Sequence, residues 1–277
     1  MSSYERYDET AAHYDRTRWP IGAEIITGCL AQGRAPLAEM AVLDAGCGTG
    51  NYARALLPHV ARIEALDRSA GMLEVAGRKL AGAIEDGRVV LHRGSIDALP
   101  LADASVDGVM INQVLHHLPD DPEAGWTAHR RVLGECARVL RPGGVLVINT
   151  CSHAQTEHGF WTFHLIPRAR AEILRRLMPV EGLETALSAC GIAPRGRLVP
   201  LDAVVQGDDY LDPRGPLRAE WRAGDSIWAL VDETELAEVE RTLRDLDARG
   251  ELEAYVAAHD TMRRHVGQIT LLYGIRR

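Results

Sequence analysis

Three glycines at alternate positions stand out in "VLDAGCGTGN", residues 42–51. Gly46, Gly48 and Gly50 follow a short apolar run and precede a helix-like segment that begins near Asn51. Bare backbone lets a ligand approach closely, and the free N–H groups of a helix start favour an anionic group. The spacing is GxGxG rather than the dinucleotide fingerprint GxGxxG, and no Gly-Lys-Ser/Thr follows, so pyrophosphate and P-loop chemistry are disfavoured. A tight strand-to-helix turn without a ligand is the structural alternative.

A carboxylate ends the next β-rich run. "IEALDRS" places Asp67 seventeen positions after Gly50, where a carboxylate can accept both hydroxyls of a ribose. Alone, Asp67 is as well explained by capping of the helix that follows Ser69. Together with the glycine loop, it indicates a nucleoside that bears an anionic tail.

Between Val42 and Ile148 the chain alternates strand-like and helix-like segments, and these elements would position the glycine loop and Asp67. The runs "AVLDA", "ARIEALD", "RVVLHRG", "VDGVMIN" and "GVLVINT" alternate with helix-like segments, which is typical of an α/β, doubly wound parallel sheet. After Thr150 we expect a loop and then two short helices interrupted at Pro179. A late strand pair is predicted in "GRLVPLDAVVQ" and "QITLLYGIRR", with an amphipathic helix over 236–246 between them.

Composition restricts the class of protein. The chain has 277 residues, 46% of them hydrophobic, which is ample for one large domain or two small ones. Its formal net charge of -8 makes a nucleic-acid backbone an unfavourable partner. The five cysteines form no CxxC pair, which suits reduced thiols better than disulfides or zinc. With a polar N-terminus and no long apolar run, we expect a cytoplasmic protein without a membrane partner.

Four ordered segments resemble the class I S-adenosylmethionine-dependent methyltransferases, in their small-molecule, methyltransferase-11-like branch. These are "VLDAGCGTGNYARAL", "IEALDRSAGMLEVA", "GSIDALPLADASVDGVMINQVLHHLPD" and "ECARVLRPGGVLVIN". The resemblance covers about residues 7–150 in register. It implies a Rossmann-like seven-stranded sheet, mostly parallel, with an antiparallel last strand and helical cap elements. The implied single domain over 1–277 comprises an N-terminal helical cap (1–35), a cofactor-binding core (40–150), a substrate-side cap with the sixth strand (151–230), and the final helix and last strand (231–277).

The resemblance also implies a site for S-adenosylmethionine and its product S-adenosylhomocysteine. The three glycines would approach the methionine part, and Asp44 would hold its ammonium directly or through water. Asp67 would take the ribose hydroxyls, with Arg68 and Met72 against the adenine. In "RGSIDAL", Ser95 stands where many relatives have an Asp that accepts from the adenine amino group, and a hydroxyl can still accept. The other predicted cofactor contacts are Tyr14, Cys47, Ile96, Asn112 and Gln113.

Two histidines are candidates for acid–base chemistry. Methyl transfer is an in-line displacement that depends on alignment and exclusion of water, and a base helps only if the nucleophile arrives protonated. His117 or His164 could supply that base. Adjacent side chains face different ways, so we expect one of His116 and His117 to be structural and place His117 near the reacting centre. A packing role for His117 is the alternative.

An aromatic cluster in "HGFWTFHLIP" contains both phenylalanines of the chain. Phe160 and Trp161 either form a pocket wall for an aromatic or apolar small-molecule acceptor or belong to a local mini-core. Tyr7 and Arg18 are further substrate candidates before the sheet region. The histidines at 153, 158 and 164 match no zinc spacing, so no metal is predicted.

Other functions remain as alternatives. A NAD-dependent oxidoreductase would share the fold but lacks support without GxGxxG. A non-catalytic S-adenosylmethionine-binding regulatory protein would share the site. An RNA or protein methyltransferase is disfavoured by the acidic charge and by "INQV" where an Asn-Pro-Pro-aromatic signature would stand. The sequence indicates neither the acceptor, nor the methylated atom, nor the oligomeric state.

Overall fold

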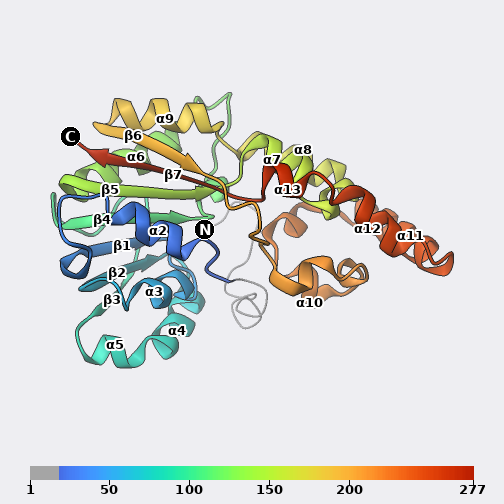
Figure 1. Cartoon of the computed structure of the whole chain (residues 1–277), viewed down its shortest axis with the longest axis horizontal. Helices are drawn as coiled ribbons and strands as arrows, with labels where there is room; N and C mark the ends of the chain where they lie inside the picture. Colours follow the sequence, from blue (N-terminus) through green and yellow to red (C-terminus); the bar gives the residue numbers. More distant parts are fainter. Residues whose placement is uncertain (1–18) are drawn as a thin grey trace.

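A seven-stranded sheet forms the body of the protein in the computed structural model, which describes residues 19–277 (Figure 1). The strand order is β3-β2-β1-β4-β5-β7-β6. The strands are β1 (Ala41–Ala45), β2 (Arg62–Asp67), β3 (Val89–Arg93), β4 (Val106–Asn112), β5 (Leu140–Thr150), β6 (Ile192–Leu198) and β7 (Thr270–Arg276). Tyr7, Tyr14 and Arg18, which the sequence proposed as ligand contacts, lie outside the described residues.

Strand direction confirms the expected topology. β1 runs parallel to β2 and β4, and β3 and β5 extend this parallel arrangement at either side. β7 is antiparallel to both of its neighbours, β5 and β6. The order reverses between β1 and β4, and ligands of open α/β sheets bind at such a switch point, beyond the carboxyl ends of the strands.

Helices cover both faces of the sheet, which explains why every residue of β1 is buried. Val42 packs in one core with residues of α2 and α3, whereas Leu43 packs in the opposite core with residues of α6 and α9. The helices that flank the sheet are α2 (Ala23–Leu30), α3 (Asn51–Leu56), α4 (Ala70–Lys79), α5 (Ala81–Glu85), α6 (Thr127–Val139) and α9 (Val180–Ala189).

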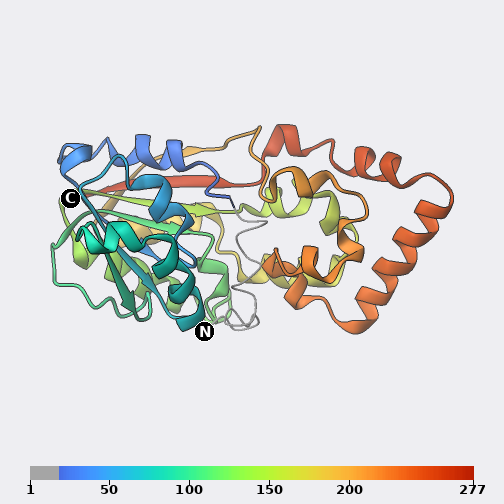
Figure 2. The same ribbon diagram turned by 90° about the horizontal axis from the view of Figure 1, so that it is seen from below.

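A helical cap lies beyond the carboxyl ends of the parallel strands (Figures 1 and 2). It contains α7 (His153–His158), α8 (Pro167–Arg176), α10 (Ala219–Arg222), α11 (Glu233–Ala248), α12 (Leu252–His259) and α13 (Arg263–Val266). Short 3-10 helices connect them, among them η3 (Trp161–His164) and η6 (Ser226–Leu230). No helix among residues 19–277 combines the length and apolar character needed to cross a bilayer.

The structure corrects two sequence expectations after Thr150. The predicted loop contains α7, because the Ser152 hydroxyl accepts from Gln155 N and the Gln155 side chain accepts from Ser152 N, a capping box. The sixth strand is shorter and earlier than predicted, Ile192–Leu198. The chain leaves the sheet there, and Val205 N instead donates to the buried Gln268 side chain at 2.7 Å. The helix predicted over 236–246 is confirmed as part of α11.

Candidate active site

The glycine loop joins β1 to α3 with all three glycines in the left-handed region, at φ 86°, 52° and 79°. A Cβ at Gly46 would lie 2.6 Å from Val114 Cγ2, and one at Gly50 would lie 2.9 Å from Leu80 Cδ1. A Cβ at Gly48 would meet nothing within 4 Å. Packing therefore requires the first and third glycines, whereas Gly48 borders open space.

Asp67 ties this loop to the end of β2. Its Oδ2 accepts from Gly48 N and its Oδ1 from Ser69 N, both at 2.8 Å. Ser69, rather than Asp67, is the N-cap of α4, since its hydroxyl accepts from Met72 N. Burial raises the pKa of Asp67, while the backbone N–H donors of Ser69 and Gly48 oppose this rise. The carboxylate is thus fixed beside the loop, with accepting capacity left for a ligand hydroxyl.

Asp44 is 1% exposed at the carboxyl end of β1. Neither of its carboxylate oxygens has a hydrogen-bond partner within the described part of the chain, and the same holds for the Asn112 amide at the end of β4. Burial, followed by the charge of Asp67, raises the pKa of Asp44 to about 7, and the neighbouring Asn112 side chain and Ala53 N–H partly oppose this rise. A buried carboxylate without a partner is costly, and a ligand ammonium would compensate it. This pair of buried polar groups beside Gly48 fits the methionine end of S-adenosylmethionine.

Two pockets adjoin at this end of the sheet. The loop pocket, with about 560 Å³ of empty space, is lined by Trp19, Ile21, Gly46, Cys47, Gly48, Thr49, Asn51, Tyr52, Asn112, Gln113, Asn149, Val205 and Ile269. The cap pocket, with about 580 Å³, is lined by Gln113, His116, His117, Cys151, Thr156, Phe160, Phe163, Ile173, Leu177, Val205, Asp225, Ser226 and Ile227. Gln113 and Val205 line both, so a group held in one pocket borders a group held in the other.

Gln113 has an unusual backbone for a non-glycine residue, with φ 55°. Its N–H donates to Asn149 O at 2.9 Å, and its side-chain Nε2 donates to Asn149 Oδ1 at 2.9 Å. Asn149 in turn donates to the Tyr52 hydroxyl at 3.0 Å. Strained backbone of this kind clusters at functional sites, where surrounding contacts hold it in place.

The cap pocket brings together His116 and His117, both in the 3-10 helix η2 (Leu115–His117). Both border the pocket, but His116 is buried and its Nε2 lies 3.4 Å from Ser226 Oγ. The expectation that one of the two histidines is structural and that His117 lies near the reacting centre stays a prediction. Their ring centroids lie 4.1 Å apart. His164 lies elsewhere in the cap, with its ring 4.9 Å from that of His259. Burial lowers the pKa of His164, and the charge of His259 lowers it further.

The residues of the aromatic cluster take different roles: Phe160 is part of a pocket wall and Trp161 is part of a packing core. Phe160 lines the cap pocket and stacks on Phe163, with ring centroids 4.3 Å apart. Trp161 is 0% exposed, and its indole N–H donates to Tyr210 O at 2.7 Å. The structure therefore places Trp161 in the packing core of the cap.

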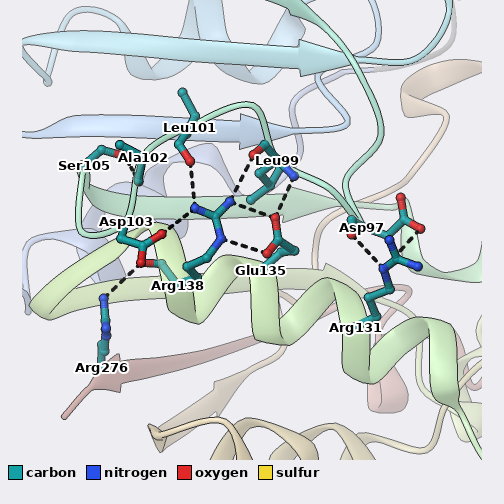
Figure 3. A network of polar contacts seen from close by, with 10 residues as sticks. All are labelled: Asp97, Leu99, Leu101, Ala102, Asp103, Ser105, Arg131, Glu135, Arg138 and Arg276. Atoms are coloured by element: carbon teal, nitrogen blue, oxygen red, sulfur yellow. Dashed lines mark hydrogen bonds and ion pairs between the residues drawn. The ribbon is translucent and has the colours of Figure 1, made fainter.

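Several predicted cofactor contacts are not among the residues that line the loop pocket: Asp44, Gly50, Asp67, Arg68, Met72, Ser95 and Ile96. Arg68 is exposed and Met72 is buried near the end of β2, while Ser95 and Ile96 follow β3. Hydrogen bonds and ion pairs connect the segment 95–105 to α6, as Figure 3 shows. Arg138 donates to Leu99 O at 3.0 Å and Leu101 O at 2.8 Å, and Leu99 N donates to Glu135 at 2.8 Å.

Several residues that line the loop pocket or the cap pocket were not predicted from the sequence. Asn149 is the penultimate residue of β5, so the rule that ligands gather at strand ends could have found it. Thr49, Asn51 and Tyr52 lie in or directly after the glycine loop. No local signal marks Asp225 and Ser226, which reach the cap pocket from a distant part of the chain.

Known proteins share these features. A family model described as methyltransferase domain matches residues 43–148, the stretch that contains the glycine loop, Asp67 and Asn112. Over these residues the chain matches the class I S-adenosylmethionine-dependent methyltransferases. S-adenosylmethionine is the methyl donor of this family. The chain is 35% identical over 145 residues to a demethylmenaquinone methyltransferase of Clavibacter sepedonicus, covering 51% of this chain and 55% of that protein.

Two further known proteins are similar to this chain, one in sequence and one in fold. A malonyl-[acyl-carrier protein] O-methyltransferase of Serratia marcescens is 38% identical over 112 residues, covering 39% of this chain and 37% of that protein. A crystal structure from Anabaena variabilis, described as a methyltransferase from an antibiotic biosynthesis pathway, superposes with a TM-score of 0.70 at 20% identity and covers 94% of this chain and 99% of that one. The chain spans about half the length of the first curated relative that it matches.

Proposed function

We propose that this protein transfers a methyl group from S-adenosylmethionine to a small-molecule acceptor. The observation that best supports this function is the pair of pockets that meet at Gln113 and Val205, one at the glycine loop and one beneath the cap. Transfer between two bound molecules needs such adjacency, because the reacting atoms must be aligned within about 3–3.5 Å. Relatives that methylate demethylmenaquinone or a malonyl group support an acceptor other than nucleic acid.

The predicted donor contacts follow from the loop pocket. We propose that Asp44 and Asn112 hold the amino-acid end, that the bare backbone of the glycine loop lies against its carboxylate side, and that Asp67 takes the ribose. Asp44 lies near the carboxyl end of β1, directly before the glycine loop, and Asp67 accepts from Gly48 N of that loop. The adenine would then lie towards the 95–105 segment, with Ser95 as its polar neighbour.

The reaction exchanges a bond from the methyl carbon to sulfur for a bond from that carbon to the acceptor atom. If the acceptor arrives protonated, we propose that a ring nitrogen of His117 takes its proton, because His117 lines the cap pocket. The cap encloses the acceptor with apolar side chains, and this excludes water from the transfer. The cytoplasmic location also remains a proposal, supported by the absence of disulfides among the five cysteines, all of which are described and free.

Calorimetric titration with S-adenosylhomocysteine tests the donor site. We expect binding to the wild-type protein, and at least tenfold weaker binding to Gly48→Ala, since a Cβ there enters open space. Gly87→Ala is the matched control, because Gly87 also has a positive φ with nothing near its Cβ position, but lies at the start of β3. A folded wild-type protein that ignores the ligand at about 1 mM overturns the proposal.

Transfer of a labelled methyl group into a panel of metabolites tests the activity itself. A labelled product supports the enzyme over the non-catalytic binding protein, and NADH binding in place of S-adenosylhomocysteine would favour the oxidoreductase. Once an acceptor is found, His117→Gln should lower turnover most near neutral pH, and less at alkaline pH, where a weakly acidic acceptor loses its proton without a base. If His117→Gln and His164→Gln, singly and together, retain wild-type turnover across the pH range, no histidine base is involved.

A further inference from the structure

The cap pocket has one wall made of planar and branched apolar side chains. Phe160 and Phe163 stack with an interplanar angle of 12° and form its most ordered part. Ile173 of α8, Leu177 directly after α8 and Ile227 of η6 extend the apolar surface. Flat apolar walls of this kind favour an aromatic ring, which gains both burial and stacking energy.

The remaining surface includes a polar pair that joins η2 to η6. Ser226 Oγ lies 3.4 Å from His116 Nε2, and the two residues are 9% and 8% exposed. Asp225 precedes Ser226, and its Oδ1 accepts from Ile227 N at 3.4 Å. A carboxylate and a hydroxyl from the cap therefore border the same space as the histidines after β4.

The charge of the pocket distinguishes between ligand classes. Among the lining residues that the structure describes, Asp225 is the single acidic side chain, and none is Lys or Arg. A ligand carboxylate or phosphate would be held in a partly buried space beside a like charge, which is unfavourable. A ligand hydroxyl or amine can instead donate to the Asp225 carboxylate or the Ser226 hydroxyl.

Resting on the proposed function, we propose that the acceptor is an aromatic compound bearing a hydroxyl or amino group, and that Asp225 and Ser226 select it by receiving that group. The stacked phenylalanines contact the ring, while Asp225 and Ser226 at the start of η6 accept hydrogen bonds from the polar substituent. Specificity is thereby set by a cap segment outside the methyltransferase domain match at 43–148.

Four probes with one ring system test this selection: 2-naphthol, 2-naphthylmethylamine, naphthalene and 2-naphthoate. Calorimetry measures their binding with and without saturating S-adenosylhomocysteine. We expect 2-naphthol and 2-naphthylmethylamine to bind at least tenfold more tightly than 2-naphthoate. Naphthalene should bind more weakly than 2-naphthol because it leaves the polar pair without a new partner.

Variants connect the selectivity to the named residues. Asp225→Asn keeps a side chain that can cap η6, so it should fold while losing most of the discrimination against 2-naphthoate. Ser226→Ala should weaken 2-naphthol by about three- to tenfold, the worth of one hydrogen bond. Asp208→Asn, an exposed acid in the preceding segment, is the matched control and should behave as the wild type.

Each outcome decides the proposal. Equal or tighter binding of 2-naphthoate, or selectivity that survives in Asp225→Asn, overturns it, and so does failure of all four probes to bind the folded protein. Failure of S-adenosylhomocysteine to bind contradicts the proposed function instead. The two results are separable because probe binding is also measured without that ligand.

Discussion

Asp44 and Gln113 both occupy positions that a structure without a ligand would avoid. Asp44 is a buried carboxylate whose oxygens have no partner among residues 19–277, and Gln113 has a left-handed backbone. Each costs stability, and each borders or underlies the loop pocket. Costs of this kind are expected where a site is preorganised for a ligand.

Replacing Asp44 should stabilise the unliganded protein in a pH-dependent way. The folded-state pKa of about 7 lies above the ordinary 3.8, so the stability present below pH 3.8 is lost as pH rises through about 7. The free energy of unfolding of Asp44→Asn should therefore exceed that of the wild type increasingly over that range, by on the order of 2–4 kcal/mol at pH 8. Urea unfolding at several pH values measures this difference.

The exposed Asp86→Asn is the matched control for this experiment and should show no such pH-dependent gain. S-adenosylhomocysteine should bind Asp44→Asn at least tenfold more weakly than the wild type, so stability and affinity move in opposite directions. An Asp44→Asn variant that is less stable than the wild type at pH 8 would contradict the role of its buried charge.

Two substitutions at Gln113 should separate backbone strain from side-chain contacts. Gln113→Gly and Gln113→Ala both lose the amide bond to Asn149, but only glycine accepts φ 55° without cost. The glycine variant should be the more stable of the two by about 1 kcal/mol in denaturant unfolding. Equal stabilities would show that this backbone is not strained.

At the scale of elements, α11 fixes the start of α8. Glu235 of α11 is 1% exposed, and its carboxylate accepts from Arg168 N at 2.7 Å and from Ala169 N at 3.2 Å. These are orphan donors of the first turn of α8, which Pro167 begins. Since Ile173 of α8 and Leu177 directly after it line the cap pocket, this contact also helps to shape that pocket.

Glu235→Ala should cost about 2–4 kcal/mol, because it leaves two buried backbone donors without an acceptor. The exposed Glu233→Ala, in the same turn of α11, should change stability by less than about 0.5 kcal/mol. The free energy of unfolding in urea measures both variants. Similar losses for the two would mean that water replaces the Glu235 contact.

At the scale of the whole molecule, buried glutamines join the cap to the sheet. Gln268, which precedes β7, accepts from Val205 N at 2.7 Å and donates to Gly159 O at 3.0 Å. Gln155 of α7 donates to Ile269 O at 2.8 Å. The cap is therefore connected to the strand that closes the sheet, and Val205 is held at the boundary between the two pockets.

Gln268→Leu should cost about 2–4 kcal/mol, since both backbone partners stay buried without replacements. It should also weaken the coupling between cap and sheet, so that unfolding followed by tryptophan fluorescence, which reports mainly on the cap, precedes unfolding followed by far-ultraviolet circular dichroism. Gln32→Leu, at an exposed site after α2, is the control. Coincident curves with unchanged stability would contradict this junction.

The sequence by itself determined the sheet and the donor side of the site. Strand periodicity, the glycine spacing and Asp67 are local features, because side-chain alternation and turn chemistry depend on near neighbours. They predicted a parallel sheet over β1 to β5, whereas the antiparallel last strand was implied by the family resemblance, and the structure confirms both.

Only the tertiary structure decided what surrounds the acceptor. Ser226 meets His116 across 110 positions of sequence, Trp161 turns into the core beneath Tyr210, and His164 packs beside His259. No local pattern encodes such meetings, because they depend on which faces of distant helices pack together. The candidate donor residues could therefore be named from motifs, whereas the residues that line the cap pocket depend on long-range packing in the cap.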